Sequence, residues 1–472
     1  DRHGDGGRDR MTDLTSLTDD AVAGWSETAG EPAWLRDTRL TAFKRFADQA
    51  WPDSRLDEYW RSTRFERFAT DLPVITEVGG APDDLDRDGL TASTDHAALV
   101  RIWDGGVVEA LIGPTARAQG VIVTDLRTAA QTHADLVRAH LGSLTTTNPD
   151  GTGADEDRTI TASDAAWTAG VFVYVPDEVE VDGPIGIRVH ASSPGAHLPR
   201  VLVVLGHHAT ADVYLEHTGG NSDRDAAVVV DEVAEFVVGD AASLNVVSLQ
   251  EWDDSVAHLS LQKAALHRGA TYRHLAVQIG GNTVRIRPEV DLVGSGASCR
   301  PLGVYFADEG QHFDMQPYIR HIAPHCTSDV LFKGALQGKA KTVFRGNVWV
   351  GKDAVGTDTN ETNRSLILSD GAKADSTPFL EILCADIRAG HGSATGQLDE
   401  DHLFYLQARG IPRVEAVRLI VFGFFREVLD EVDLVGVRER TMAHIEREIE
   451  TADLARIGVT HRSLRPEPAE VA

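Results

Sequence analysis

The chain has little sulfur and no long apolar run. Its 472 residues include only three cysteines, Cys299, Cys326 and Cys384, which form no Cys-x-x-Cys pair. This argues against a disulfide framework and fits a reducing cytoplasm. No apolar core of a signal peptide is visible near the start. The longest strongly apolar run, 419–425, is far short of a bilayer span, so we expect no membrane partner.

Positive charge and aromatic side chains are also scarce. Acidic residues outnumber basic ones 73 to 45, which gives a formal net charge of −28. A surface this acidic repels phosphate backbones and anionic lipids, so nucleic acid and membranes are poor partners. A bias of genome composition or habitat explains the acidity more simply than a functional surface does. Aromatics make up 6% while Gly numbers 43, a balance that suits short strands and tight turns.

The first 150 residues are predicted to be mostly helical. Residues 1–10 are expected to be a disordered leader. Apolar side chains then recur at helical spacing through about residue 68, with a break at Pro52. A small αβ element is predicted over 99–125 and a helix over 126–141. The run TTTNPDGTGADED (145–157) is a strong loop signal and a plausible domain boundary.

A different pattern follows from residue 151 to residue 396. Helical periodicity is nearly absent, and short β-rich runs lie between turns that contain Gly and Asp. These runs are 171–175, 185–190, 201–205, 211–215, 235–238, 244–249 and 272–279. Gly-containing corners at Gly239, Gly269 and Gly296 recur every 27 to 30 residues, with another at Gly371. This interval suits one coil of a solenoid, so the pattern favours a mainly β fold with a β-helix over a sandwich.

The segment 397–460 is predicted to be helical again. Asp399 is a good N-cap, and Arg409 followed by Gly410 is a helix stop. Pro412 opens a second helix, and a third runs to about residue 450. The tail 461–472 is expected to be disordered.

Three motifs resemble known sites without meeting their requirements. GNVWVGK (346–352) begins like a phosphate loop, but Asp353 replaces the Ser or Thr that would hold Mg²⁺. GSGASC (294–299) lacks the last glycine of a dinucleotide fingerprint. His312, His321, His325 and Cys326 have spacings that match no zinc module. No flavin, nicotinamide or nucleotide site can be placed from these motifs.

Six blocks in the last third of the chain carry a family resemblance. They are APHCTSDVLFKG (323–334), VFRG (343–346), TNRSLILSD (362–370), LEI (380–382), GHGSATG (390–396) and LDEDHLFYLQARGIP (398–412). Their order and spacing resemble the SufB/SufD family of the SUF iron–sulfur cluster assembly system. The GHG block followed by LFYLQARGI is similar to SufD rather than SufB. The resemblance implies a right-handed parallel β-helix core flanked by N-terminal and C-terminal α-helical regions.

The same resemblance implies a site and partners. His391, between Gly390 and Gly392, would face a SufB-like paralogue in a heterodimer and help hold a nascent iron–sulfur cluster or iron. Imidazole is a known ligand of iron in such clusters. A SufC-like ABC ATPase would bind the C-terminal helices. The expected contact residues are Leu403, Phe404, Tyr405, Arg409 and Gly410. A reduced flavin is compatible with the assembled complex, and a homodimer is an option for the isolated chain.

Two departures from the family pattern limit the chemistry of this chain. SufD often has a cysteine two residues before the histidine, where this chain has Ala389. SufB has its cluster-building cysteine in the segment that corresponds to TNRSLILSD, which has none. Cys384 is expected to be a core residue. We therefore expect a non-catalytic, SufD-like assembly subunit.

Two alternatives remain open. One is an enzyme built on a β-helix, such as a polysaccharide lyase or an acyltransferase. The sequence shows neither the secretion signal and charged clusters usual in lyases nor the strict hexapeptide repeats of acyltransferases. The other is a homodimeric SufB/SufD-like scaffold.

Overall fold

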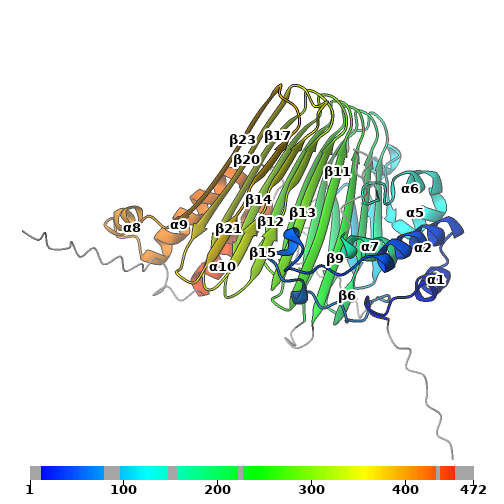
Figure 1. The fold of residues 1–472 in the computed structure, drawn as a ribbon, viewed down its shortest axis with the longest axis horizontal. Coiled ribbons are helices and arrows are strands. Elements are labelled where there is room, and N and C mark those ends of the chain that lie inside the picture. Colours follow the sequence, from blue (N-terminus) through cyan, green and yellow to red (C-terminus); the bar gives the residue numbers. More distant parts are fainter. Residues whose placement is uncertain (1–11, 79–95, 147–156, 222–226, 432–435, 452–472) are drawn as a thin grey trace, which may run out of the picture.

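The computed structural model of the chain describes residues 12–78, 96–146, 157–221, 227–431 and 436–451. The expected leader 1–10, the expected tail 461–472 and most of the expected loop 145–157 lie outside these ranges. Within the described residues, two β-sheets face each other along the molecule, with helices at both ends (Figure 1).

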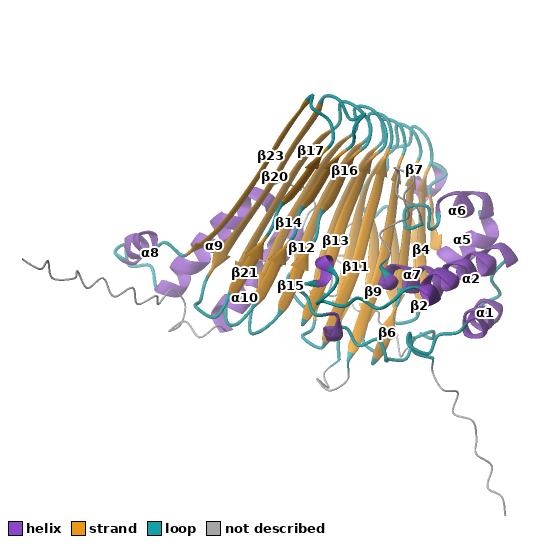
Figure 2. Ribbon diagram, viewed as in Figure 1, coloured by secondary structure: helices purple, strands orange, loops and turns teal. Residues whose placement is uncertain are grey.

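The two sheets are built from strands that alternate along the chain. The 10-stranded sheet contains, in spatial order, β2 (Gly106–Ile112), β1 (Ala98–Trp103), β5 (Ile185–Ala191), β8 (Thr210–Gly219), β10 (Ser243–Trp252), β12 (Thr271–Gln278), β14 (Ser298–Ala307), β17 (Thr327–Leu336), β20 (Thr357–Ile367) and β23 (Ile387–Gln397). The 13-stranded sheet contains, in chain order, β3 (Ile122–Asp125), β4 (Ala169–Val175), β6 (Gly195–His197), β7 (Pro199–Leu205), β9 (Val228–Val238), β11 (Val256–Leu266), β13 (Thr283–Leu292), β15 (His312–Met315), β16 (Tyr318–His321), β18 (Lys341–Phe344), β19 (Asn347–Val350), β21 (Lys373–Ser376) and β22 (Phe379–Ile382). All but two of the strand pairs are parallel, and the chain makes about eight turns of a solenoid (Figure 2). The expected mainly β, β-helical core is confirmed.

The helices lie toward the two ends of the solenoid, and the C-terminal ones also pack on the outer face of the 10-stranded sheet (Figure 1). The N-terminal ones are α1 (Asp19–Thr28), α2 (Ala33–Asp48), α4 (Pro114–Ala118), α5 (Leu126–Thr132), α6 (Ala134–His140) and α7 (Arg158–Ala166), and two 3₁₀ turns cover Glu58–Trp60 and Phe65–Arg67. The C-terminal ones are α8 (Glu400–Gln407), α9 (Arg413–Leu429) and α10 (Val437–Thr451). The expected helical regions before and after the core are therefore present.

Each expected β-run between 171 and 279 lies in a strand, except that Ile279 follows the end of β12. The helix expected over 126–141 is two helices, because His133 has a non-helical φ of −132° and ψ of 41° between them. The helical pattern expected to continue past Pro52 is wrong as an α-helix. Trp60 and Phe65 lie in 3₁₀ turns and pack with Leu259 on the 13-stranded sheet, so tertiary packing overrides local periodicity.

Apolar residues fill both the interior and the outer faces of the sheets. The interior holds side chains from the two sheets, such as Val213 and Val238. The outer face of the 10-stranded sheet is covered by α9 and α10, with Val421 and Phe425 in the same cluster as Val277. Because strands of a solenoid are covered on both faces, they can be buried along their whole length: all eleven residues of β9 are buried, including three acidic ones.

The recurring corners stack in one column along the solenoid. Gly269 and Gly296 have φ of +67° and +74°, and each donates its amide to the next coil, at Ser295 and Pro324. In the preceding coil Ala241, rather than the expected Gly239, has this conformation, with φ of +55°. Glycine suits this left-handed region because it has no Cβ. The fourth expected corner glycine, at 371, does not have a positive φ.

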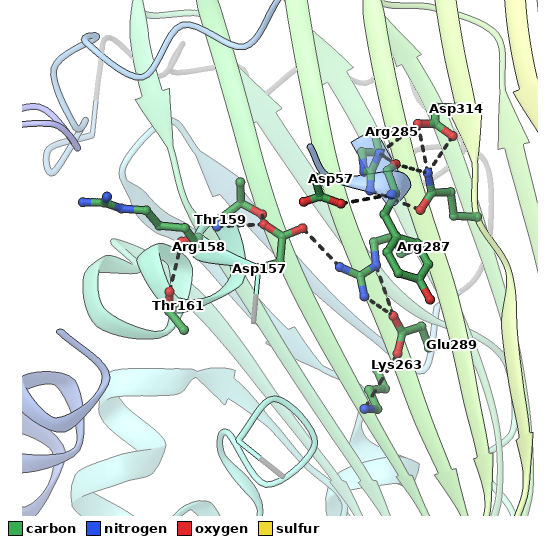
Figure 3. Close-up of polar contacts among 12 residues, drawn as sticks. Asp57, Asp157, Arg158, Thr159, Thr161, Lys263, Arg285, Arg287, Glu289 and Asp314 are labelled. Carbon is green, nitrogen blue, oxygen red and sulfur yellow. Dashed lines mark hydrogen bonds and ion pairs between the residues drawn. The ribbon is translucent and has the colours of Figure 1, made fainter. Parts of the chain in front are cut away.

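Charged side chains attach the N-terminal segment to the outer face of β13 (Figure 3). Arg285 donates to Asp314 at 2.9 Å and to the carbonyl of Tyr59 at 2.9 Å. Arg287 donates to Asp157, the N-cap of α7, at 3.2 Å. The contacts of Arg285 with Tyr59 and of Arg287 with Asp157 join residues 226 and 130 positions apart, so they fix the N-terminal helical region on the solenoid wall.

One interior glycine should be intolerant of any side chain. Gly334 on β17 lies beside Tyr305 on β14, and a Cβ there would fall inside the tyrosine ring. Tyr305 is buried, so the ring cannot move out to solvent. We expect Gly334→Ala to lower the free energy of unfolding by about 1–3 kcal/mol, measured by urea unfolding. Gly396→Ala, with no atom within 4 Å of its Cβ, is the matched control, and equal destabilisation by both would contradict the prediction.

Candidate functional site

The C-terminal end of the solenoid is open. The 10-stranded sheet ends at β23, which pairs with β20 and with no other described strand. Figure 1 shows β23 at this outer edge, next to β20 and above α9. An unpaired edge presents free backbone N–H and C=O groups to any strand that can add to it. The last coil is therefore a natural place for another chain to dock.

The inward face of the preceding strand, β20, is polar along most of its length. Its residues alternate between buried and exposed from Thr357 to Ser365. The buried, inward-facing residues are Thr357, Thr359, Glu361, Asn363 and Ser365. On β17, the residue aligned with Glu361 is Val330, which belongs to the apolar interior. The core thus changes from apolar to polar at the open end.

Hydrogen bonds between coils hold this polar layer in place. Asn363 donates to the hydroxyl of Ser376 at 2.8 Å, and Ser393 donates to the same oxygen at 2.8 Å. The Tyr305 hydroxyl donates to Asn363 at 3.2 Å. Thr359 bonds to the Ser328 hydroxyl at 2.7 Å. These contacts join four successive strands of one sheet to β21 of the other.

Glu361 is the one acidic residue of this layer, and its carboxylate has no hydrogen-bond partner among the described residues. Its side chain is only 1% exposed. Burial raises its pKa to about 8, because a charged carboxylate in this position has lost its water. Gly346 makes room for it, since a Cβ on Gly346 would overlap the carboxyl group. A buried and unpartnered carboxylate of this kind is suited to bind a cation.

His391 lies directly above Glu361 in the next coil. The two residues are aligned in the parallel register of β20 and β23, so their side chains are on the same face of the sheet. His391 is exposed, and a Cβ at its neighbour Gly392 would meet no atom within 4 Å. The open end therefore places an accessible imidazole over a buried carboxyl group. Imidazole nitrogen and carboxylate oxygen are both ligands of ferrous iron.

The other residues predicted to be functional lie on α8 and at its end. Phe404 and Tyr405 are 72% and 56% exposed, whereas Leu403 is fully buried against α9. The guanidinium of Arg409 lies 3.6 Å over the ring of Tyr405, and Gly410 has the positive φ, +84°, of a helix stop. The exposed aromatics are free to contact a partner, and Leu403 would act only by holding α8 in place.

The histidines near Cys326 are not brought together. His312 contacts the Thr63 hydroxyl at 2.8 Å, and His321 contacts the Ser328 hydroxyl at 2.8 Å. His325 is at a corner with φ of +58°. Among the described residues, the one cluster of three or more potential metal ligands lies elsewhere, inside the solenoid. Cys384, expected in the core, is half-buried and packs against the edge of the core.

Sequence reasoning missed Glu361 because both faces of its strand are polar. The run TDTNETNRS has no apolar residue at any position, so the usual alternation of a half-buried strand is absent. The lack of apolar residues in this strand, compared with the apolar runs of earlier strands, was the signal that could have revealed its polar inward face. No helix in the described part of the chain has the length and apolarity needed to cross a bilayer.

The fold and this open end define a β-solenoid scaffold protein with helical regions at both ends. Comparison with known families gives two matches: "SUF system FeS cluster assembly, SufBD core domain" over residues 188–424, and "SufBD protein N-terminal region" over 26–187. The chain belongs to the SufBD family, which takes part in iron–sulfur cluster assembly.

Similar proteins agree with this family. An iron–sulfur cluster assembly SufBD family protein of Mycobacterium tuberculosis is 41% identical over 313 residues, which cover 64% of this chain and 76% of the relative. SufD of Bacillus subtilis is 27% identical over 92% of this chain and 98% of its own length. SufB of the same species is 25% identical over 89% of this chain and 90% of its own length. The difference between these two identities is too small to separate SufD from SufB.

Proposed function

We propose that this chain is the SufD-like subunit of a scaffold complex that assembles iron–sulfur clusters together with a SufB-like paralogue and a SufC-like ATPase. In this proposal His391 and Glu361 hold iron, or the iron of a nascent cluster, at the junction with the paralogue. The observation that carries the proposal is the register that places His391 over Glu361 at an unpaired solenoid end. The cluster is cargo shared with the partner.

The absence of cysteine from the two strands that hold Glu361 and His391 supports the SufD-like assignment. The polar strand β20 contains no cysteine. Cys299 and Cys326 are buried elsewhere in the core, and Cys384 is half-buried. In this proposal the thiolate and the sulfide of the cluster come from other proteins, and this chain acts as a non-catalytic subunit. None of the three cysteines forms a disulfide, in keeping with a reducing cytoplasm.

The surface around the open end supports a protein partner. Beside the unpaired edge of β23, the last coil exposes Phe379, Ile382 and Leu383, which are 38%, 41% and 55% exposed. Apolar side chains next to a free strand edge suit the addition of strands from a second chain. A paralogue with the same solenoid would continue both sheets. A second copy of this chain could use the same edge, and the mass of the purified assembly distinguishes the two.

The exposed aromatics of α8 support a separate contact for the ATPase. Phe404 and Tyr405 project from a helix whose buried side, at Leu403, is anchored on α9. Aromatic residues with this exposure commonly act as anchors at protein interfaces. The family resemblance also admits a reduced flavin in the assembled complex, and no described residue of this chain selects a site for it.

Co-purification tests the proposed partners. With the chain co-expressed beside its SufB-like and SufC-like partners, we expect Phe404→Asp to lose the ATPase and keep the paralogue, because the charge would be buried at that contact. Leu56→Asp is the control, since Leu56 is 86% exposed beside the outer face of β13, on the sheet that does not contact α9, and should keep both partners. A wild-type chain that purifies alone and cleaves polysaccharide or transfers acyl groups would overturn the proposal.

A further inference from the structure

A second group of ligand-type side chains lies inside the solenoid, several coils from the open end. His217 on β8, Glu232 on β9 and His258 on β11 each offer one ligand atom, and these atoms all lie within 4.8 Å of one another. The three side chains are 0%, 0% and 1% exposed. Their neighbours include the polar residues Ser260 and Gln262, but most residues of the interior are aliphatic, so this group of ionisable side chains requires an explanation.

The group joins the two sheets across the core. His217 belongs to the 10-stranded sheet, while Glu232 and His258 belong to the 13-stranded sheet. The Nε2 atom of His217 lies 2.8 Å from Oε1 of Glu232, and Nε2 of His258 lies 4.0 Å from Oε2. The indole of Trp252 packs beside both imidazoles, with ring centroids 5.7 Å apart in each case. The rings are therefore held in position by packing.

Hydrogen bonds satisfy both oxygens of the Glu232 carboxylate but leave three imidazole nitrogens of the group without partners in the described part of the chain. Ser260 donates to Oε2 of Glu232 at 2.8 Å, and Gln262 donates to the same oxygen at 3.4 Å. In contrast, both nitrogens of His258 and Nδ1 of His217 have no hydrogen-bond partner among the described residues. A buried polar atom without a partner is uncommon in a folded protein and points to something that completes it.

The ligand set identifies the chemical class of the missing partner. Two imidazoles and one carboxylate are a common ligand set for zinc and for ferrous iron, and both metals accept further ligands at open positions. Neutral imidazole and ionised carboxylate are the forms that bind metal.

We propose that His217, Glu232 and His258 bind one divalent transition-metal ion of the zinc and ferrous-iron class, which ties the two sheets together inside the solenoid. Since the site is closed to solvent, the ion enters while the chain folds. The site needs no partner chain and does not depend on the proposed role in cluster assembly.

Metal retention after refolding tests the site. The full-length chain is unfolded in urea with a chelator and refolded with or without Zn²⁺, and bound zinc is measured after dialysis. We expect one zinc ion per chain and a higher thermal midpoint than in the zinc-free sample. Refolding with Co²⁺ should give the visible absorption of nitrogen and oxygen ligation. Glu232→Gln and His258→Gln should each reduce bound metal at least tenfold.

Two control variants make the result specific. His274 is another buried histidine of the same interior, bonded to Gln262 at 2.7 Å, and His274→Gln should retain the metal. His391→Ala should also retain it, which separates this site from the open end. Wild-type chain that refolds without binding zinc or cobalt would overturn the proposal, and so would His258→Gln with undiminished binding. Because the wild-type measurement decides by itself, a variant that fails to fold does not obscure the outcome.

Discussion

His391→Ala is expected to remove most of the iron from the assembled complex while leaving the complex and the fold intact. The side chain is exposed at the last coil, between two glycines, so its removal creates no cavity. It supplies the accessible nitrogen over Glu361, and a site that loses one of few iron ligands holds iron much less tightly. We expect iron and acid-labile sulfide in the co-purified complex to fall at least tenfold.

The matched control for this change is His207→Ala. The His207 side chain is 46% exposed between β7 and β8, several coils from the open end. It should leave iron content, sulfide content and partner binding unchanged. Wild-type iron content in the His391→Ala complex would remove His391 from the proposed site. Loss of the paralogue together with the iron would instead assign His391 to docking.

Glu361→Gln is expected to stabilise the isolated chain strongly at pH 8 and hardly at pH 5. The folded chain keeps a proton on Glu361 up to its pKa of about 8, whereas the unfolded chain releases it near the ordinary value of 4.5. The contribution of Glu361 to the free energy of unfolding is therefore most favourable below pH 4.5. It is lost as the pH rises from 4.5 toward 8. One pKa unit is equivalent to about 1.4 kcal/mol, so the loss at pH 8 is roughly 4 kcal/mol.

Glutamine has nearly the same shape as glutamate and carries no charge. It should therefore remove the loss of stability that ionisation of Glu361 causes at pH 8. Urea unfolding at the two pH values measures the difference, and Glu381→Gln, on the exposed face of the neighbouring strand β22, is the control. The same variant should lower the iron content of the assembled complex, because glutamine is a far poorer ligand for iron than carboxylate. A wild-type chain whose stability relative to Glu361→Gln does not change with pH would contradict the raised pKa.

His391 could be predicted from the sequence as a site residue, whereas Glu361 could not. His391 stood out because small neighbours and a family motif surround it. Glu361 did not, because the spacing of 30 residues between it and His391 has no meaning until the length of one coil is known. A parallel register is set by the corners on either side of each strand, and one corner is made by Ala241 rather than by the glycine that marked it.

Local chemistry explains what the sequence determined by itself. The strands between 171 and 279 were visible because most of them contain short runs of alternating or continuous apolar residues, which favour half-buried or fully buried strands. The start and end of α8 were visible at Asp399, which accepts amide hydrogen bonds from Asp401 and His402, and at Gly410. Each of these features depends on residues within a few positions of one another.

Only the tertiary structure decided which distant residues meet. It brought Glu361 beneath His391, and it placed His217, Glu232 and His258 together from three strands of two sheets. It also drew Trp60 out of a helical pattern and onto the solenoid wall. The physical reason is that stacking coils brings together side chains whose separation along the chain depends on the length of each turn, and local periodicity carries no record of that length.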